Sequence, residues 1–471
     1  MVTVLAFAGV VVALMQTVII PLVPQLPTLL RASPSDTTWA ITATLLASAV
    51  ATPTVGRLGD MYGKRRMLLV SLGMLVLGSV VAALSVTLTP MIVGRVLQGL
   101  SAGVIPLGIS IMRDELAAER LHSGTALMSA SLGVGGALGL PLAAFVAERA
   151  DWHVLFWAAA AIGVLAAVLV VSVVPESDVR SGGRFDVVGG IGLSAGLLCL
   201  LLPVSKGAAW GWTSAPVLGL FAATVVIFAA WGWWELRTRQ PLVNLRTLAR
   251  RQLLLTNLAS IVFGFAIFAM SLVLPQVLQL PVATGYGLGQ SLLVVGLVLA
   301  PSGLVMMAMA PISARITRTA GPKTTLMVGA VVVAIGYGSG VFLMSTIWEL
   351  VLVSALIGAG IGLAYGSMPA LVMAAAPVSE TASANSVNTL MRAIGTAVSS
   401  AVAGLILTEM TIPFGAGAVA SMDAFRLVMG IAAGTALAAL AVAAFLPAGR
   451  PPAPTHEPVR PRATPVPAAG A

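Results

Sequence analysis

Long apolar runs, separated by short segments rich in charged residues, Pro and Gly, form the dominant pattern of this 471-residue chain. A helix that crosses a membrane needs about 20 mostly apolar residues, and the runs have this length. The pattern predicts an all-α polytopic membrane protein with fourteen crossings. They lie near residues 2–26, 37–56, 67–86, 90–112, 122–147, 152–174, 187–204, 215–235, 252–276, 288–312, 324–344, 347–374, 384–408 and 424–446.

The spacing of these runs divides the chain into two six-helix halves, residues 1–174 and 252–446, with two intervening crossings in 187–235. Alternatively, the Gly-rich run 187–204 forms a re-entrant hairpin with its neighbour, which would leave twelve crossings. Residues 447–471 are rich in Pro and Ala and predict a disordered cytoplasmic tail.

Composition narrows the class of protein. Hydrophobic residues make up 58% of the chain and charged residues 9%, whereas a soluble domain is roughly 45–50% apolar. The 16 acids, three His and single Cys199 are too scattered for a metal cluster, a disulfide framework or a thiol catalyst. The crossings also lack a phosphate-binding Gly-Lys-Ser/Thr loop. We therefore expect no catalytic residue, no metal and no cofactor. A membrane-embedded enzyme or sensor is a remote alternative.

Positive charge predicts the orientation, because loops rich in Lys and Arg stay in the cytoplasm. The alternate loops on one side carry 19 of the 25 Lys and Arg residues, and those on the other side carry four. We predict a multi-pass protein of the inner (plasma) membrane with both termini cytoplasmic. The first run begins near Met1 without a basic segment before it and reads as a retained span. Topology and contact with anionic membrane lipids account for the net charge of +9, so we expect no nucleic-acid partner.

The segment between the second and third runs, residues 56–66 (GRLGDMYGKRR), is dense in glycine and basic residues, and a related segment follows the tenth run. Aligning Gly63 with Gly321 shows the relation. The aligned basic pairs are Arg57 with Arg315 and Arg65 with Lys323. Two related halves around a midplane cavity are typical of secondary transporters, in which rocking of the halves alternates access.

These residues resemble the major facilitator superfamily, and specifically its fourteen-helix drug:proton antiporter family, over nearly the whole chain. Residues 56–66 resemble the signature loop in which an acid and basic residues lock and release the two halves. The gating set that this resemblance implies is Gly56, Arg57, Asp60, Gly63, Lys64, Arg65 and Arg66. The alternative interpretation of these charges is that they only set the membrane topology.

A second resemblance lies in the run 90–112, where Arg95, Gln98 and Gly99 match the motif whose buried Arg is implicated in coupling proton movement to transport. A charge inside a crossing costs at least about 2.5–3.5 kcal/mol, so Arg95 needs a partner or water. The structural alternative is that Arg95 only holds its helix to neighbouring backbone carbonyls.

A third resemblance lies in the run 122–147, where Gly135, Gly139 and Pro141 are similar to the antiporter motif that bends a helix at a Gly-Pro pair. The resemblance implies a hinge there. The match departs from the family pattern, because the proline comes one position late and Ala143 and Ala144 replace the terminal glycines.

The 16 acids all fall in loops or near predicted helix ends, so no carboxylate for proton transfer is visible in the middle of a crossing. In the first run, Met15 stands where the family commonly has an Asp. The remaining proton carriers are Asp36, Glu148 and Glu409 near the outer face or Asp60 and Asp114 near the inner face.

A cavity without carboxylates would suit neutral or anionic amphipaths more than cations. The residues that we expect to line it are Gln16, Trp39, Asn257, Gln276 and Arg392. Arg392 has an alternative interpretation, because a long side chain near a helix end can extend to the cytoplasmic surface.

The sequence therefore predicts a secondary active transporter of the major facilitator fold that exports drug-like or secreted small metabolites by proton antiport with alternating access. Its partners would be a lipophilic small-molecule substrate, protons and membrane lipids, and the chain would be a monomer. The alternative is a facilitator or importer of a small nutrient or metabolite without proton antiport. The departures in the run 122–147 and the missing acid of the first run motivate it.

Overall fold

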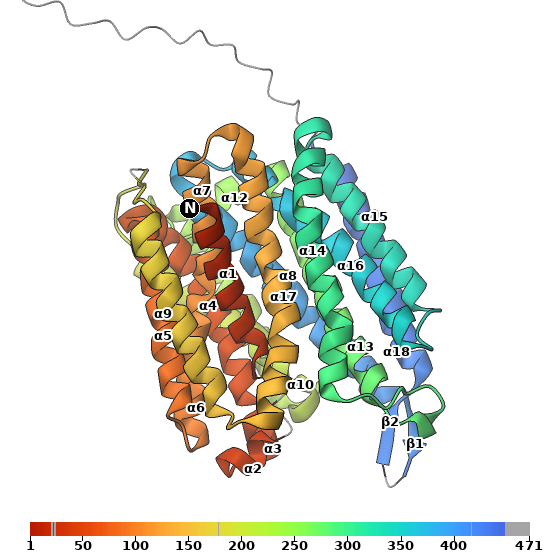
Figure 1. Cartoon of the computed structure of the whole chain (residues 1–471). Coiled ribbons are helices and arrows are strands. Elements are labelled where there is room, and N and C mark those ends of the chain that lie inside the picture. Colours follow the sequence, from red (N-terminus) through yellow and green to blue (C-terminus); the bar gives the residue numbers. More distant parts are fainter. Residues whose placement is uncertain (20–21, 23–24, 178, 416, 448–471) are drawn as a thin grey trace, which may run out of the picture.

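The computed structural model of the chain describes residues 1–19, 22, 25–177, 179–415 and 417–447, and shows a bundle of long helices (Figure 1). The helices of the first half are α1 (Val2–Thr17), α4 (Trp39–Tyr62), α5 (Lys64–Ala83), α6 (Leu88–Gly99), η2 (Leu100–Gly103), α7 (Val104–Glu115), α8 (Ala118–Arg149) and α9 (His153–Val173). The segments α6, η2 and α7 follow one another directly as a single crossing. Two short helices, α2 (Leu26–Leu30) and α3 (Pro34–Thr37), precede α4.

Three helices separate the halves: α10 (Val187–Trp210), α11 (Ala215–Arg237) and the short α12 (Leu245–Leu248). The helices of the second half are α13 (Arg251–Gln279), η3 (Val282–Thr284), α14 (Leu292–Ala320), α15 (Pro322–Gly340), α16 (Ile347–Ala375), η4 (Val378–Glu380), α17 (Thr381–Glu409) and α18 (Met422–Ala444). Both α10 and α11 are long continuous helices that pack against each other, as the fourteen-crossing prediction requires.

Within the described residues, thirteen helices are long and apolar enough to cross a membrane, so the predicted all-α membrane fold is confirmed. The remaining crossing, predicted at 2–26, contains α1, which has only 16 residues. Residues 20, 21, 23 and 24 of that run lie outside the described part. The tail predicted at 447–471 lies outside it from residue 448 onward.

Helix starts follow from capping residues in the sequence. At α16, the Thr346 side chain accepts the Glu349 N–H while the Glu349 carboxylate accepts the Thr346 N–H, which forms a capping box. Asp186 and Ser421 cap α10 and α18 through the same kind of side-chain acceptor. These caps satisfy N–H groups that lack a partner within the helix.

The segment 56–66 is mostly helical, and its interpretation as a loop was wrong. Helix α4 extends to Tyr62 and α5 begins at Lys64, so the two helices meet at Gly63, whose φ is +117°. Gly321, with φ of +88°, separates α14 from α15 in the same way. Because only glycine adopts such positive φ without strain, it ends one helix and allows the next to begin at once.

The internal repeat extends to side-chain contacts. Arg65 Nη2 donates to the carbonyl oxygen of Val171 at 2.6 Å, near the end of α9, the last helix of the first half. Its aligned partner Lys323 donates from Nζ to the carbonyls of Ala444 and Leu446, each at 2.7 Å, at the end of α18. In each half, the same basic position therefore caps the carboxyl end of the sixth helix, where a positive charge is favourable.

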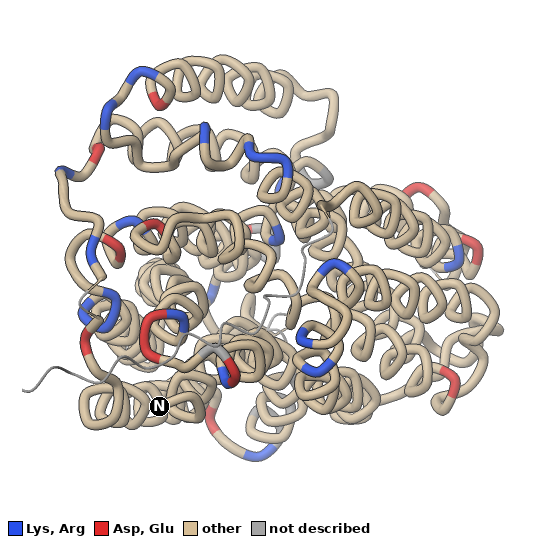
Figure 2. The backbone as a smooth tube through the Cα atoms, turned by 90° about the horizontal axis from the view of Figure 1, so that it is seen from above, with Lys and Arg blue, Asp and Glu red and all other residues tan. Residues whose placement is uncertain are grey.

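Each half has its own apolar core. Phe156 is fully buried in the first half, and Phe263 and Phe425 are buried in the second. The halves join where α8 packs along α14 and where α4 packs on α17, while α10 contacts both α4 and α17. Viewed from the end at which residue 1 lies, most charged residues are at helix ends and connections (Figure 2).

An antiparallel hairpin of β1 (Thr411–Phe414) and β2 (Gly417–Ala420) connects α17 to α18, with Thr411 opposite Ala420. The sequence analysis did not predict these strands. They lie at the end of the bundle opposite residue 1 (Figure 1). The hydroxyl of Tyr286 donates to the carbonyl oxygen of Ala420 and so connects the hairpin to the segment before α14.

Candidate functional site

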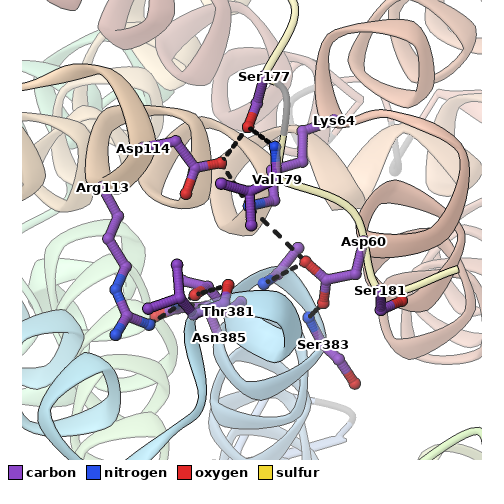
Figure 3. A network of polar contacts seen from close by, with 12 residues as sticks. Asp60, Lys64, Arg113, Asp114, Ser177, Val179, Ser181, Thr381, Ser383 and Asn385 are labelled. Carbon is purple, nitrogen blue, oxygen red and sulfur yellow. Dashed lines mark hydrogen bonds and ion pairs between the residues drawn. The ribbon is translucent and has the colours of Figure 1, made fainter.

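Asp60, near the end of α4, bonds to the amino end of α17 in the other half of the molecule (Figure 3). Its fully buried carboxylate accepts the Ala382 N–H on Oδ1 at 3.1 Å and the Ser383 N–H on Oδ2 at 2.8 Å. The first N–H groups of a helix have no partner within the helix and carry a partial positive charge. A carboxylate placed there is stabilised, and in this chain it joins the two halves.

Lys64 lies between two carboxylates. Its Nζ is 3.9 Å from Asp60 Oδ1 and 2.5 Å from Asp114 Oδ2, and both the Lys64 and Asp60 side chains are fully buried. The Ser177 hydroxyl donates to the same Asp114 oxygen at 2.5 Å. Buried charges of opposite sign hold one another in place, because each would be costly to leave unpaired.

Arg113, at the end of α7, makes the second polar contact between the halves. It donates from Nη1 to Thr381 Oγ1 at 2.5 Å and from Nη2 to the carbonyls of Met373 and Ala376 at 2.9 and 3.4 Å. Met373 and Ala376 lie at the end of α16, and Thr381 lies at the start of α17. Figure 3 shows the Arg113 side chain extending toward Thr381. From the sequence, Arg113 was one of the basic residues assigned to the predicted cytoplasmic loops, with no role in joining the halves. Its position next to Asp114 was the available signal.

We call Asp60, Lys64, Arg113, Asp114 and the amino end of α17 the latch. Helix α4 ends and α17 begins at the end of the bundle where residue 1 lies, which is the predicted cytoplasmic end (Figure 1). Gly56 allows the close approach there: a Cβ at this position would collide with Ser386 Oγ and lie 2.8 Å from the carbonyl oxygen of Ala382.

The other members of the predicted gating set lie beside the latch. Arg57 Nη1 is 3.4 Å from Ser181 Oγ. The Glu176 carboxylate accepts the Arg65 and Arg66 N–H groups, both at 3.2 Å, and so caps the start of α5 next to Gly63. The Arg65 side chain bonds to the end of α9, and the Arg66 side chain is exposed. The structure therefore brings Asp60 and Lys64 together with α17, whereas Arg65 and Arg66 organise the first half.

Arg95 is enclosed by the first half and is 1% exposed. It donates from Nε to the Ala40 carbonyl of α4 at 3.0 Å, and from Nη1 to the Met15 carbonyl of α1 at 3.0 Å and to Gln98 Oε1 at 2.8 Å. Gln98 in turn donates to Ser79 Oγ of α5 at 2.9 Å. These contacts match the alternative interpretation, in which Arg95 holds its helix to neighbouring backbone carbonyls. Arg95 thereby joins α1, α4 and α6.

Gly99 is the third predicted coupling residue, after Arg95 and Gln98. A Cβ at this position would lie 2.6 Å from the carbonyl oxygen of Thr44 and 2.8 Å from the Cβ of Ala47, both on α4. The glycine therefore allows α6 to pack closely on α4, the helix whose other end carries Asp60.

Replacing Arg95 by Ala is expected to destabilise the protein by about 3 kcal/mol, because hydrogen bonds to a charged group are each worth about 1.5–3 kcal/mol. The change removes the Arg95 donor from Gln98 Oε1 and from the Met15 and Ala40 carbonyls, of which the Ala40 carbonyl still accepts the Thr44 hydroxyl. Thermal unfolding of the purified protein in detergent checks this. Replacing the 48% exposed Arg426 by Ala serves as the control, and equal unfolding midpoints for the two variants would contradict the account.

The predicted hinge residues lie on α8, which runs without interruption through Pro141. A Cβ at Gly135 would lie 2.5 Å from the Ala13 Cβ of α1, and one at Gly139 would collide with the Thr17 hydroxyl of the same helix. Pro141 faces the second half, where a Cβ at Gly296 would lie 2.9 Å from its nitrogen. These three residues allow α8 to pack closely on both α1 and α14.

Three predicted cavity residues, as the structure describes them, share no hydrogen bond or ring contact with one another. Gln16 is exposed near the end of α1, and Gln276 is half-buried near the end of α13. Trp39 is half-buried at the start of α4, where the Lys206 Nζ of α10 lies 4.8 Å from its ring centroid. The structure does not bring these three side chains together.

The other two cavity residues, Asn257 on α13 and Arg392 on α17, belong to one cluster. Asn388 connects them: it donates from Nδ2 to Asn257 Oδ1 at 3.0 Å and to Ser260 Oγ at 2.7 Å, and its Oδ1 lies 3.4 Å from Arg392 Nη1. The ring of Tyr365, on α16, lies 4.8 Å from the Arg392 Cζ. We call Asn257, Ser260, Tyr365, Asn388 and Arg392 the polar cluster. Sequence reasoning missed Ser260 and Tyr365.

Comparison with known proteins gives a consistent result. The family model described as Major Facilitator Superfamily matches residues 5–400. A "Multidrug resistance protein B homolog" of Mycobacterium tuberculosis is 26% identical over 382 residues, which are 79% of this chain and 69% of that protein. A "Tetracenomycin C resistance and export protein" of Streptomyces glaucescens is 27% identical over 329 residues, which are 69% of this chain and 59% of that protein.

The chain spans between 59% and 72% of the length of the curated relatives it matches. Among solved structures, the human organic anion transporter TETRAN superposes with a TM-score of 0.64 at 15% sequence identity. The superposition covers 94% of this chain and 98% of that chain. At this identity the likeness concerns the fold.

Proposed function

The chain belongs to the major facilitator superfamily, and on this premise we propose that it is a secondary active transporter that exports drug-like or secreted small metabolites by proton antiport. It is an integral membrane protein of the transporter class and not an enzyme. The exporting direction is supported by the relatives named as a multidrug resistance protein homolog and as a tetracenomycin C resistance and export protein. We place the protein in the plasma membrane with both termini cytoplasmic, as a monomer.

The latch is the observation that carries this proposal. It joins the halves through Asp60 and Arg113 at the predicted cytoplasmic end, and its acceptors and donors are groups that water can replace. When such a hydrogen bond is broken and its groups bond to water instead, the net change in free energy is only about 0.5–3 kcal/mol. Such a contact can therefore open and close during a transport cycle, as alternating access requires. Gly135, Gly139 and Pro141 would let α8 adjust as the halves rock.

Coupling to protons would pass from Arg95 to the latch through α4. Arg95 joins α1 to α4, and α4 carries Asp60 at its other end, so a shift of Arg95 and Gln98 would reach the latch through one helix. Asp60 and Asp114 are the acids nearest to this route. A proton taken up by either of them would weaken its attraction to Lys64.

A facilitator or importer without proton antiport is the second candidate. In the part of the chain that the structure describes, neither Arg95 nor Arg392 has a carboxylate within 4.0 Å, and the acids within the latch lie at helix ends. A proton carrier in the middle of a crossing is the commonest arrangement in proton-driven transport. Its absence from these contacts is what favours this alternative.

Inverted membrane vesicles distinguish the two candidates, because export is then seen as uptake. Vesicles energised with a proton gradient are given a panel of fluorescent lipophilic compounds, and the native chain is compared with Arg95→Ala and Asp60→Asn. Accumulation that collapses with a protonophore and fails in both variants supports proton-coupled export. Equilibration regardless of the gradient supports the facilitator. A purified, reconstituted protein that gives no substrate-dependent flux would refute both.

A further inference from the structure

Arg392 is a buried cation in the interior of a transmembrane helix. It is the twelfth residue of α17, about 16 Å along the helix from its start at a rise of about 1.5 Å per residue. Only 8% of its surface is exposed. A charged side chain at this depth needs a partner or water and marks a functional site by default.

The protein itself gives Arg392 few partners. Its Nη2 donates to Thr389 Oγ1 at 3.0 Å and its Nη1 to Asn388 Oδ1 at 3.4 Å, and both acceptors lie one turn earlier on the same helix. The Tyr365 ring covers one side of the guanidinium, with 4.8 Å between Cζ and the ring centroid. Among the described residues, no carboxylate lies within 4.0 Å of Arg392.

The guanidinium therefore keeps unused donors. It has five N–H groups, and the two bonds above leave three without a hydrogen-bond partner among the described residues. None of its nitrogens is among the fully enclosed atoms without a hydrogen-bond partner, and the side chain retains exposed surface. The Nε–H, which makes no hydrogen bond with any described residue, therefore reaches a space that a water molecule can enter.

Arg95 provides a comparison within the same chain. It is almost completely enclosed, and its bonds run to carbonyls of two other helices and to Gln98. Its contacts are those of a residue that holds helices together. Arg392 instead bonds only to its own helix, so its contacts do not explain why a charge is retained there.

The surroundings of Arg392 orient it and supply further donors. Asn388 is fixed from α13 by Asn257 and Ser260, which turns its Oδ1 toward Arg392. The Asn257 amide nitrogen has no acceptor among the described residues, and its side chain is 7% exposed. Phe263 packs edge-on against the Tyr365 ring, so aromatic walls adjoin the charge. Asn257 and Arg392 both bond to Asn388, so their donors belong to one cluster. Donors beside aromatic rings suit a ligand with a compact anionic group on a lipophilic body.

We propose that the polar cluster binds the anionic group of an amphipathic substrate, a carboxylate or a group of the same charge and shape, through Arg392 and Asn257. This inference rests on the proposed function and specifies its substrate class. The substrate's anion supplies the counter-charge that no described residue provides at this position. Arg392 presents planar donors that match two carboxylate oxygens.

The latch controls access to this cluster from one end. Ser383, which bonds to Asp60, lies nine residues before Arg392 on α17, about 14 Å along the helix. In this proposal the closed latch obstructs approach to Arg392 along α17 from the predicted cytoplasmic end. An anionic substrate would therefore enter from the cytoplasm only while the latch is open.

Paired probes that differ only in charge test the proposal. The dissociation constants of dansyl-phenylalanine and its methyl ester are measured by fluorescence on the purified full chain in detergent. The native protein is expected to bind the acid about 10 to 100 times more tightly than the ester. Arg392→Gln is expected to remove this preference, and Arg392→Lys to retain part of it. Arg426→Gln, at an exposed position, is the matched control.

The outcomes separate this inference from the proposed function. Equal binding of acid and ester, binding of neither, or an unchanged preference in a well-folded Arg392→Gln protein would overturn the inference. If proton-driven export of neutral or cationic probes then persists, the proposed function stands without this substrate class. If the acid binds through Arg392 but no gradient-driven flux follows, the site stands and the proposed export fails. Thermal unfolding of each variant establishes that it is folded.

Discussion

Replacing Asp60 by Asn is expected to slow transport at least about tenfold and to favour the state in which the predicted cytoplasmic end is open. The carboxylate accepts two backbone N–H groups at the start of α17, and Asn keeps one acceptor oxygen but no charge. A buried charge at a helix amino end is worth up to about 2 kcal/mol, which is roughly a 30-fold change in the population of the closed state. Lys64 would keep only Asp114 as its ionic partner.

A cysteine at position 386 reports the state of the latch. Ser386 is fully buried against Gly56, and its hydroxyl makes no hydrogen bond with any described residue, so Ser386→Cys removes no contact. The background is Cys199→Ser, because Cys199 is the single cysteine of the chain. We expect a membrane-permeant maleimide to label this cysteine slowly in the otherwise native protein and at least about tenfold faster with Asp60→Asn.

Asp423→Asn is the matched control for Asp60→Asn. Asp423 also lies in the first turn of a helix, α18, but its side chain is 78% exposed and pairs with Arg426 at 3.5 Å. We expect unchanged labelling and unchanged transport. Equal labelling rates for native and Asp60→Asn proteins would contradict the role of Asp60 in closing the molecule.

Replacing Gly303 by Val is expected to abolish transport and lower the thermal stability of the protein. Gly303 lies on α14, and a Cβ there would collide with the Gly133 carbonyl oxygen and the Ala137 Cβ of α8. Overpacking costs about 1–3 kcal/mol, and a backbone carbonyl cannot yield as a flexible side chain can. The added methyl groups would therefore push the halves apart where α8 and α14 pack together.

Gly434→Val provides the control for this effect. Gly434 also lies within a transmembrane helix, α18, and among the described residues no atom beyond its chain neighbours and the nearby backbone of its own helix lies within 4 Å of its Cβ position. The two variants share the same loss of backbone freedom, so their difference reports the contact with α8. Proton-driven uptake into inverted vesicles and thermal unfolding are the two measurements. A Gly303→Val protein that transports like Gly434→Val would show that close packing of α8 on α14 is dispensable.

The apolar runs predicted nearly every long helix, because length and hydrophobicity decide whether a segment crosses a membrane. The ends of the helices were predicted less accurately from the sequence. Arg57 and Asp60 are polar and were placed in a loop, yet α4 continues through them because their side chains are satisfied by partners far along the chain. The end of α1 at Thr17 and the pairing of β1 with β2 could not be predicted from the lengths of apolar runs.

Only those residues of the candidate site that belong to a sequence motif, or that place a charge in an apolar run, could be predicted. The motif between α4 and α5 pointed to Asp60, and the charge in an apolar run pointed to Arg95 and Arg392. Their partners could not be predicted, because a single sequence gives no information on contacts between distant residues. The bond from Arg113 to Thr381 spans 268 positions, and the bonds from the Arg65 and Arg66 N–H groups to Glu176 span 111 and 110.

The central claim of this account is that the latch opens and closes in every transport cycle, and a disulfide across it tests this claim directly. A Cβ at Gly59 on α4 would lie 3.9 Å from the Cβ of Ala382 on α17, within the range of about 3.5–4.5 Å that disulfides need. It would also collide with the end of the Leu107 side chain, so that flexible end would have to shift. Gly59→Cys with Ala382→Cys, in the Cys199→Ser background, is the variant of choice.

Proton-driven uptake of a fluorescent substrate into inverted vesicles is measured with this double variant before oxidation, after oxidation and after reduction. Each single-cysteine variant, treated in the same way, is the control for side effects of the added thiols and of the oxidant. The account predicts that oxidation stops uptake in the double variant alone and that reduction restores it. Undiminished uptake by protein shown to be fully cross-linked would contradict the account.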